Sequence, residues 1–250
     1  MKKIHAFVLS FLLAATYAGA TNKEEKSLWL IEEVFVKFGK KDAYETLEKN
    51  WRDGFKNFLG GGGLWRTKKH SWNFYSLQAS NDSQYMFFVP MENFSDLGDF
   101  FSKKEEFNLT QNKDQVQIRQ SLRSVTNFTV SSLHTYLSSC SRVSQMNIDA
   151  WDKFPYLYFL SYGITPGNQN IFEDHLASLA NDTKLELNGT IYRVWRVLVG
   201  SDLPKYLILI SSQTEDQLKS AKDSLNFTTP AMKDIIRNQR EGQALYKPNL

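Results

Sequence analysis

The chain repeats one short pattern at positions roughly 128 residues apart, and this repetition constrains the fold more than any other feature of the sequence. The first copy reads VKFGKKDAYE from Val36 to Glu45, and the second reads ITPGNQNIFE from Ile164 to Glu173. Each copy follows an apolar run and opens a helical pattern. A period this long indicates two copies of one small domain rather than a solenoid. We therefore expect two related halves, over residues 27–140 and 154–247.

The first twenty residues have the order of a secretory signal peptide. Lys2 and Lys3 precede an apolar stretch from Ile4 to Tyr17, and Ala18-Gly19-Ala20 follows. We predict a signal peptide over residues 1–20, with cleavage after Ala20. Because a membrane span needs about 20 apolar residues, no membrane span is expected after cleavage. An uncleaved N-terminal anchor is the alternative.

The short basic start and the single cysteine favour bacterial export, to the periplasm or the extracellular space. In a eukaryotic secreted protein the Asn-x-Ser/Thr triplets would instead be glycan acceptors. Cys140 has no second cysteine to pair with, so a hydrophobic core must hold the fold. We interpret Cys140 as a packing residue.

The charge balance argues against nucleic acid as a partner. Removing Lys2 and Lys3 takes the basic count from 30 to 28 against 27 acidic residues, which leaves a formal charge of +1. Binding to phosphate backbones needs a clustered basic face. The histidines and the single cysteine do not have the spacing of metal ligands, so no metal site is expected.

Periodicity predicts the same order of elements in both halves. In the first half we expect a strand over 28–36, a helix from Asp42, a hairpin of 71–77 and 85–89 with its turn at 81–83, helices after Ser95 and over 105–126, and a closing strand over 130–137. In the second half we expect strands over 156–164, 191–199 and 206–210, helices over 169–180, 215–225 and 232–240, and a short strand over 244–246.

This split β-α-β order, with Phe38-Gly39 and Tyr44-Glu45 in one copy and Pro166-Gly167 and Phe172-Glu173 in the other, resembles the dimeric α+β barrel superfamily. That superfamily includes antibiotic-biosynthesis-monooxygenase-like and NIPSNAP-type domains. The resemblance implies an α+β fold in which two tandem ferredoxin-like βαββα(αβ) repeats pack sheet to sheet as an intrachain pseudo-dimeric barrel. It further implies a monomer with internal pseudo-symmetry and a ligand cavity in the barrel interior.

The resemblance brings no catalytic signature, because cofactor-free oxygenases, haem-degrading enzymes and haem-binding chlorite dismutase-like proteins share this fold. We expect an exported soluble protein that binds a small apolar or aromatic molecule in the barrel, without established catalysis and without a cofactor. One alternative is a monooxygenase-like or haem-dependent enzyme using the same cavity. A protein-interaction module is the other alternative.

Carboxylate, tyrosine and arginine side chains on the predicted strands are candidates to contact such a ligand. Glu32 and Glu33 are adjacent in a strand, so one of them must face the barrel. Alignment of the copies places Glu32 on the face of Tyr158 and Tyr162, and predicts that Glu32 points inward. An ion pair of Glu32 with Arg193 or Arg196 is the structural alternative.

Two histidines complete the candidate ligand-binding set. His175 lies among Ile171, Phe172 and Leu176, which predicts a place on the buried face of its helix. Since haem proteins of the resembling fold use an axial histidine, His175 is the candidate haem ligand. His134 lies on the closing strand and is a second inward candidate. For both histidines, packing in the core is the alternative interpretation.

Overall fold

The computed structural model describes residues 28–59, 73–77, 84–91, 93–143, 153–182 and 189–247, and for 73–77 it describes the backbone alone. The predicted signal peptide over 1–20 and the predicted turn at 81–83 lie outside the described residues.

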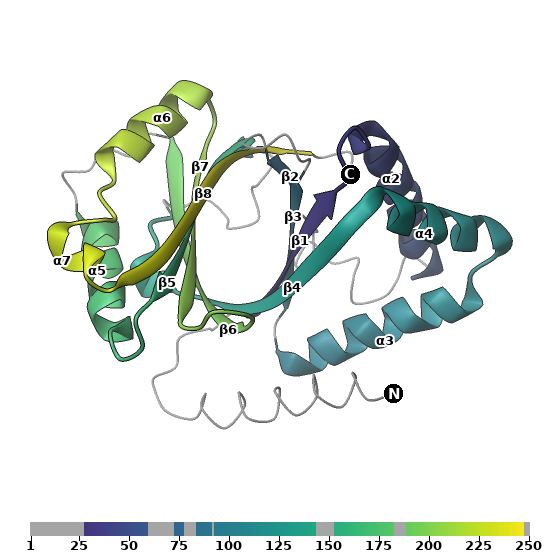
Figure 1. Cartoon of the computed structure of the whole chain (residues 1–250), viewed down its shortest axis with the longest axis horizontal. Coiled ribbons are helices and arrows are strands. Elements are labelled where there is room, and N and C mark those ends of the chain that lie inside the picture. The colour runs from purple at the N-terminus through teal and green to yellow at the C-terminus, as the bar shows by residue number, and fades with distance from the viewer. Residues whose placement is uncertain are drawn as a thin grey trace.

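The described strands form one curled antiparallel sheet that closes into a barrel (Figure 1). Their order around the barrel is β1-β3-β2-β8-β5-β7-β6-β4. The bounds are β1 Leu28–Val36, β2 Asn73–Leu77, β3 Gln84–Met91, β4 Thr126–Tyr136, β5 Tyr156–Ile164, β6 Thr190–Val199, β7 Lys205–Ser212 and β8 Ile236–Tyr246. The mixed α+β fold predicted from the sequence is confirmed.

The barrel consists of two groups of four strands with the same internal order. The first group runs β4-β1-β3-β2 and the second runs β8-β5-β7-β6. Two seams join the groups, where β2 pairs with β8 and β4 pairs with β6. In the second seam only Leu133–Tyr136 of β4 is paired, so the first part of β4 is bonded on one side, to β1.

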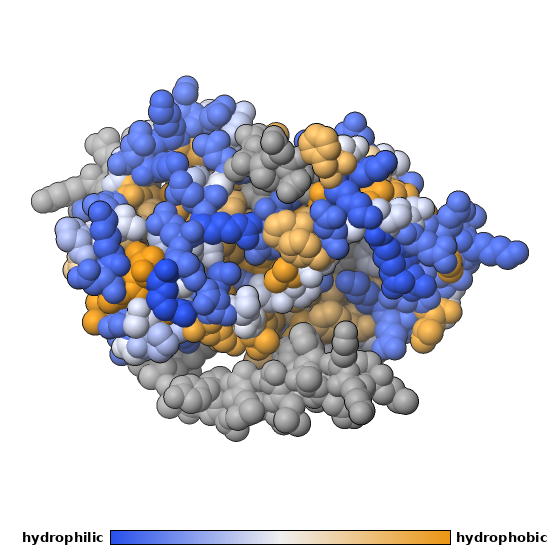
Figure 2. Space-filling model, viewed as in Figure 1, coloured by the Kyte–Doolittle hydropathy of each residue, from blue (hydrophilic) through white to orange (hydrophobic). Residues whose placement is uncertain are grey.

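Helices cover the outside of each group of strands (Figure 1). In the first half they are α2 Lys41–Phe58, α3 Phe94–Thr110 and α4 Lys113–Val125; in the second they are α5 Gln169–Asn181, α6 Glu215–Ser224 and α7 Pro230–Lys233. Hydrophilic side chains cover much of the outward surface of these helices (Figure 2). None of the described helices is long and apolar enough to cross a membrane.

Strand side chains alternate between the barrel interior and the helix layers, as the pleat requires. On β1, Trp29 and Ile31 belong to the interior cluster, whereas Leu28 and Leu30 pack under the helices. Because both faces of the sheet are covered, the strands read as continuous apolar runs. Cys140 is buried in a short 3-10 helix, Ser138–Cys140, and forms no disulfide. This agrees with its interpretation as a packing residue.

The C-terminal segment differs from the prediction. A helix was expected over 232–240, but α7 ends at Lys233 and β8 begins at Ile236. Residues Ile236–Glu241 pair with β5 from Ile164 back to Leu160. The segment is polar because most of its side chains are exposed, so its sequence lacks the apolar alternation that marks a strand. Pairing with a neighbouring strand therefore decides its conformation.

Candidate functional site

The barrel interior is packed almost solid below its open end. Trp29 and Trp195 meet edge to face with ring centroids 5.7 Å apart, and Phe88 lies 6.3 Å from Trp195. The other buried members of this interior cluster are Ile31, Met86, Leu157, Phe159, Leu207, Leu209 and Ala244. The rings and branched side chains leave little space between the two sheets, as in other small barrels.

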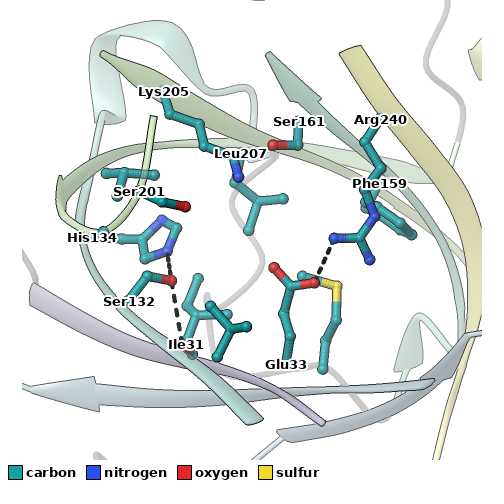
Figure 3. A pocket seen from close by; sticks show the side chains of 14 residues that line it. Ile31, Glu33, Ser132, His134, Phe159, Ser161, Ser201, Lys205, Leu207 and Arg240 are labelled. Carbon is teal, nitrogen blue, oxygen red and sulfur yellow. Dashed lines mark hydrogen bonds and ion pairs between the residues drawn. The ribbon is translucent and has the colours of Figure 1, made fainter. Parts of the chain in front are cut away.

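A small cavity lined by both polar and apolar side chains lies at one end of the barrel and is here called the barrel cavity (Figure 3). Its volume is about 30 Å³, which suits about one or two water molecules. The lining residues are Ile31, Glu33, Met86, Val130, Ser132, His134, Phe159, Ser161, Val197, Gly200, Ser201, Lys205, Leu207 and Arg240. The described side chains thus leave no room in the barrel for the apolar or aromatic molecule predicted there.

His134 lines the barrel cavity, as the sequence predicted. Its Nε2 atom is 2.7 Å from Ser132 Oγ. Burial, and to a smaller extent the charge of Lys205, lower the pKa of His134 to about 3. The imidazole is therefore neutral, and it serves here as a hydrogen-bonding group.

Glu33, and not Glu32, is the inward carboxylate of β1. Glu33 accepts hydrogen bonds from Arg240 Nη1 at 2.7 Å and from Gln84 Nε2 at 2.9 Å (Figure 3). Arg240 reaches across the barrel from β8 and lies 5.4 Å from the ring centroid of Phe159. The prediction for Glu32 was wrong because the face that it shares with Tyr158 and Tyr162 is the outer one.

Tyr158 and Tyr162 accordingly lie outside the barrel, in the core between β5 and its covering helices. The Tyr158 hydroxyl donates to Glu241, and the Lys222 ammonium lies 4.2 Å above the Tyr158 ring. The Tyr162 ring packs 5.7 Å from Phe172. Burial raises the pKa of both tyrosines. These two side chains stabilise the second helix layer and do not reach the barrel cavity.

The two arginine candidates lie on opposite faces of β6. Arg196 faces outward and forms an ion pair with Glu173, with Nη1 3.0 Å from Oε1. Arg193 is fully buried and alternates with Tyr192 and Val194 of the outer core, which places it on the inner face. It does not line the barrel cavity. Neither position supports the predicted ion pair with Glu32.

His175 is half-buried on the outside of the barrel, not on the buried face of its helix. Its Nε2 is 3.3 Å from the carbonyl oxygen of Asn226, while Phe172 and Leu176 make the buried face. Ile171, the neighbour that suggested burial, is 51% exposed. The buried face of α5 is therefore narrower than the sequence predicted, and it includes neither Ile171 nor His175.

A cavity larger than the barrel cavity lies between the sheet and the helices of the first half, and we call it the helix-layer cavity. Its volume is about 430 Å³, within the range of about 300–1,000 Å³ typical of small-molecule sites. It is lined by Glu32, Val34, Tyr44, Glu48, Trp51, Phe87, Phe100, Lys104, Asn108, Arg119, Leu122, Arg123, Thr126, Thr129 and Ser131. Of the predicted site residues, Glu32 alone lines it.

Helix α2 carries a polar row within its apolar face, and the first two members of this row line the cavity. Tyr44, Glu48 and Arg52 follow one another at four-residue spacing, which places them along one side of the helix. The Arg52 Nε atom is 3.7 Å from Glu48 Oε1, and the guanidinium lies 4.5 Å above the Phe87 ring. Burial raises the pKa of Glu48, although Arg52 opposes that shift. The sequence signal that could have revealed this row is a Glu-Arg pair at four-residue spacing among apolar residues.

A second charged group crosses the cavity from sheet to helix. Lys104 Nζ on α3 is 3.8 Å from Glu32 Oε1, and Ser131 donates to the same oxygen at 3.1 Å. The Lys104 ammonium also lies 5.8 Å from the Trp51 ring and 5.6 Å from the Phe100 ring. The charges at this end of the cavity are therefore paired within the protein.

Neither cavity fits haem. The barrel cavity has the histidine but is far too small for a porphyrin. The helix-layer cavity is larger, but its lining includes no histidine, cysteine or methionine, and burial raises the pKa of its Tyr44 well above the ordinary value, which disfavours a phenolate ligand. His175 faces Asn226 outside both cavities. Among the described residues, no cluster of His, Cys, Asp or Glu could hold a metal ion either.

No family model matches the chain. Likewise, no curated protein sequence matches it. Solved structures do match. A proposed monooxygenase from Fusobacterium nucleatum superposes with a TM-score of 0.56 at 12% identity, over 88% of this chain and 92% of its own.

Two further structures match over similar lengths. An anthrone oxidase-like protein gives a TM-score of 0.58 at 12% identity, over 90% of this chain and 92% of its own. Chlorite dismutase from Candidatus Nitrospira defluvii, in complex with imidazole, gives 0.53 at 11% identity, over 90% and 93%. At such identities the likeness concerns the fold alone. The chain therefore shares the closed α+β barrel fold of these structures.

Proposed function

We propose that this is an exported, monomeric protein that binds a small, largely aromatic molecule in the helix-layer cavity. The observation that carries the proposal is the contrast in volume, about 430 Å³ under the helices of the first half against about 30 Å³ in the barrel. Trp51, Phe87 and Phe100 supply aromatic walls, and a few charged groups converge between them. This is the usual construction of a small-molecule site.

We also propose that the two halves are copies of one ferredoxin-like unit. The first half binds the ligand, and the second half has a structural role. The difference lies in two helices: α3 has 17 residues against 10 in α6, and α4 has 13 residues against four in α7. In the second half Leu218, Leu225, Phe227 and Met232 fill the space between sheet and helices. The longer α3 and α4 hold the first helix layer away from the sheet and leave the cavity.

Filling the cavity tests the proposal. Leu122 lines the cavity from α4, so Leu122→Trp should displace an aromatic ligand. We expect wild-type protein to bind phenylnaphthylamine, a neutral aromatic probe, with a stoichiometry of one by calorimetry. Because the larger indole side chain occupies the cavity and removes apolar contacts with the probe, we expect the variant to bind the probe at least about tenfold more weakly.

The matched control is Leu109→Trp, which adds the same side chain at a position 80% exposed on α3. This variant should bind the probe as the wild type does. Unchanged binding by Leu122→Trp, with correct folding by circular dichroism, would contradict the helix-layer cavity as the site.

Catalysis in the same cavity is the second candidate function, and the raised pKa of Glu48 favours it. A buried carboxylate with a raised pKa beside an aromatic pocket is suited to take a proton from a bound substrate. Because one structural neighbour is an anthrone oxidase-like protein, anthrone is a reasonable test substrate. Oxygen consumption with anthrone that is lost in Glu48→Gln, with phenylnaphthylamine binding retained, would support this candidate.

A further inference from the structure

Two arginines on α4 line the helix-layer cavity without a partner of their own. Arg119 and Arg123 are one helical turn apart, so their side chains lie on the same side of α4. Within the described residues neither guanidinium forms an ion pair, and the buried Nε of Arg119 has no hydrogen-bond partner. A buried donor without an acceptor is costly unless a ligand supplies one.

No acidic residue lies three or four positions along the chain from either arginine, where it could pair with them. The positions three and four residues away from either arginine hold Gln115, Val116, Gln120, Leu122, Thr126 and Asn127, none of them acidic. Like charges at four-residue spacing destabilise a helix. Two positive charges have thus been placed together at the edge of an aromatic cavity with no compensating group on the helix.

The acidic groups of the cavity are already engaged. Glu32 lies against Lys104 and accepts a hydrogen bond from Ser131, and Glu48 lies against Arg52. The charge that remains on the cavity wall is therefore that of Arg119 and Arg123. Guanidinium groups bind carboxylate, sulfonate and phosphate oxygens in a forked geometry.

We propose that the ligand of the helix-layer cavity is an amphipathic organic anion, with its aromatic or apolar body between Trp51 and Phe100 and its acidic group between Arg119 and Arg123. This inference rests on the proposed function and adds the chemical class of the ligand. The acidic group would supply the acceptor that Arg119 Nε lacks and would offset the repulsion between the two arginines.

Two probes that differ only in charge test the inference. Phenylnaphthylamine and anilinonaphthalene sulfonate share one aromatic skeleton, and only the second carries a sulfonate. We expect wild-type protein to bind the sulfonate at least about tenfold more tightly, because a hydrogen bond to a charged group contributes about 1.5–3 kcal/mol, which corresponds to about tenfold or more. The preference should shrink as salt is raised.

The double variant Arg119→Gln with Arg123→Gln should lose this preference and still bind phenylnaphthylamine as the wild type does. A matched control, Lys153→Gln with Lys219→Gln, removes the same number of charges from exposed positions outside the first half and should keep the preference. If the double variant does not fold, Arg123→Glu at an exposed position should weaken sulfonate binding alone.

The outcomes separate the two proposals. Equal binding of both probes by the wild type, or an unchanged preference in the folded arginine variants, overturns the anionic ligand and leaves small-molecule binding standing. Failure of the wild type to bind either probe overturns both the anionic ligand and the proposed function.

Discussion

At the scale of single residues, the chemistry of this protein depends on which side of a strand a side chain occupies. Glu32 and Glu33 are neighbours, yet Glu33 bonds Arg240 inside the barrel while Glu32 faces Lys104 in the helix-layer cavity. The sequence showed that the two carboxylates diverge. It did not show which carboxylate faces the barrel, because the residues of β1 before and after the two glutamates are apolar on both faces of the strand.

Acid should destabilise the protein through His134. Its pKa lies near 3 in the folded chain against 6.5 for the ordinary group, so the unfolded chain binds a proton that the folded chain does not. The stabilisation is complete above pH 6.5 and is lost as the pH falls towards 3. Between pH 6.5 and 4 the loss is at most about 3 kcal/mol.

The measurement is urea denaturation across this pH range. His134→Gln should show a smaller loss of unfolding free energy on acidification than the wild type. His175→Gln, which removes a half-buried ring outside the barrel, is the control and should follow the wild type. Equal slopes for His134→Gln and the wild type would show that His134 does not titrate as described.

At the scale of elements, local signals placed α5 and α6 of the second half well and placed its last helix and last strand badly. Helix α6 begins at a capping box, in which Thr214 accepts from Gln217 N and Gln217 accepts from Thr214 N. Such a start is visible in sequence. Strand β8 has no comparable signal, since its exposed residues are as polar as those of a surface helix.

Removal of the cap should destabilise α6 measurably. Thr214→Ala takes away the side-chain acceptor of Gln217 N, at 3.3 Å, and we expect a loss of about 1 kcal/mol in the free energy of unfolding. Chemical denaturation is the measurement. Thr46→Ala in the interior of α2, where the hydroxyl bonds Asp42 O at 2.9 Å, is the control and should be close to neutral. A cap variant as stable as this control would refute the argument.

At the scale of the whole molecule, each half presents an apolar inner face that only the other half covers. Trp29, Ile31 and Phe88 of the first half pack with Phe159 and Leu209 of the second. The seams add backbone pairing of β2 with β8 and of β4 with β6. The Glu33–Arg240 ion pair spans the open end between the halves.

The halves should therefore depend on each other for folding. Expressed separately, residues 27–140 and 154–247 should aggregate or self-associate, because each exposes its inner face and two unpaired strand edges. Co-expressed, they should purify as an equimolar complex by size-exclusion chromatography. Ile31→Asp, which places a charge in the shared interior, should abolish the complex. Two folded, monomeric fragments with no affinity for each other would contradict this architecture.

The sequence by itself predicted the order of elements up to α6 and a repeated short pattern, because apolar periodicity and glycine turns act within a few residues along the chain. It also placed His134 inside the barrel. Only the tertiary structure decided that the barrel is filled and that the larger cavity lies under α2, α3 and α4. Cavity volume depends on how far a helix layer stands from its sheet, and that distance is set by packing between residues remote in sequence.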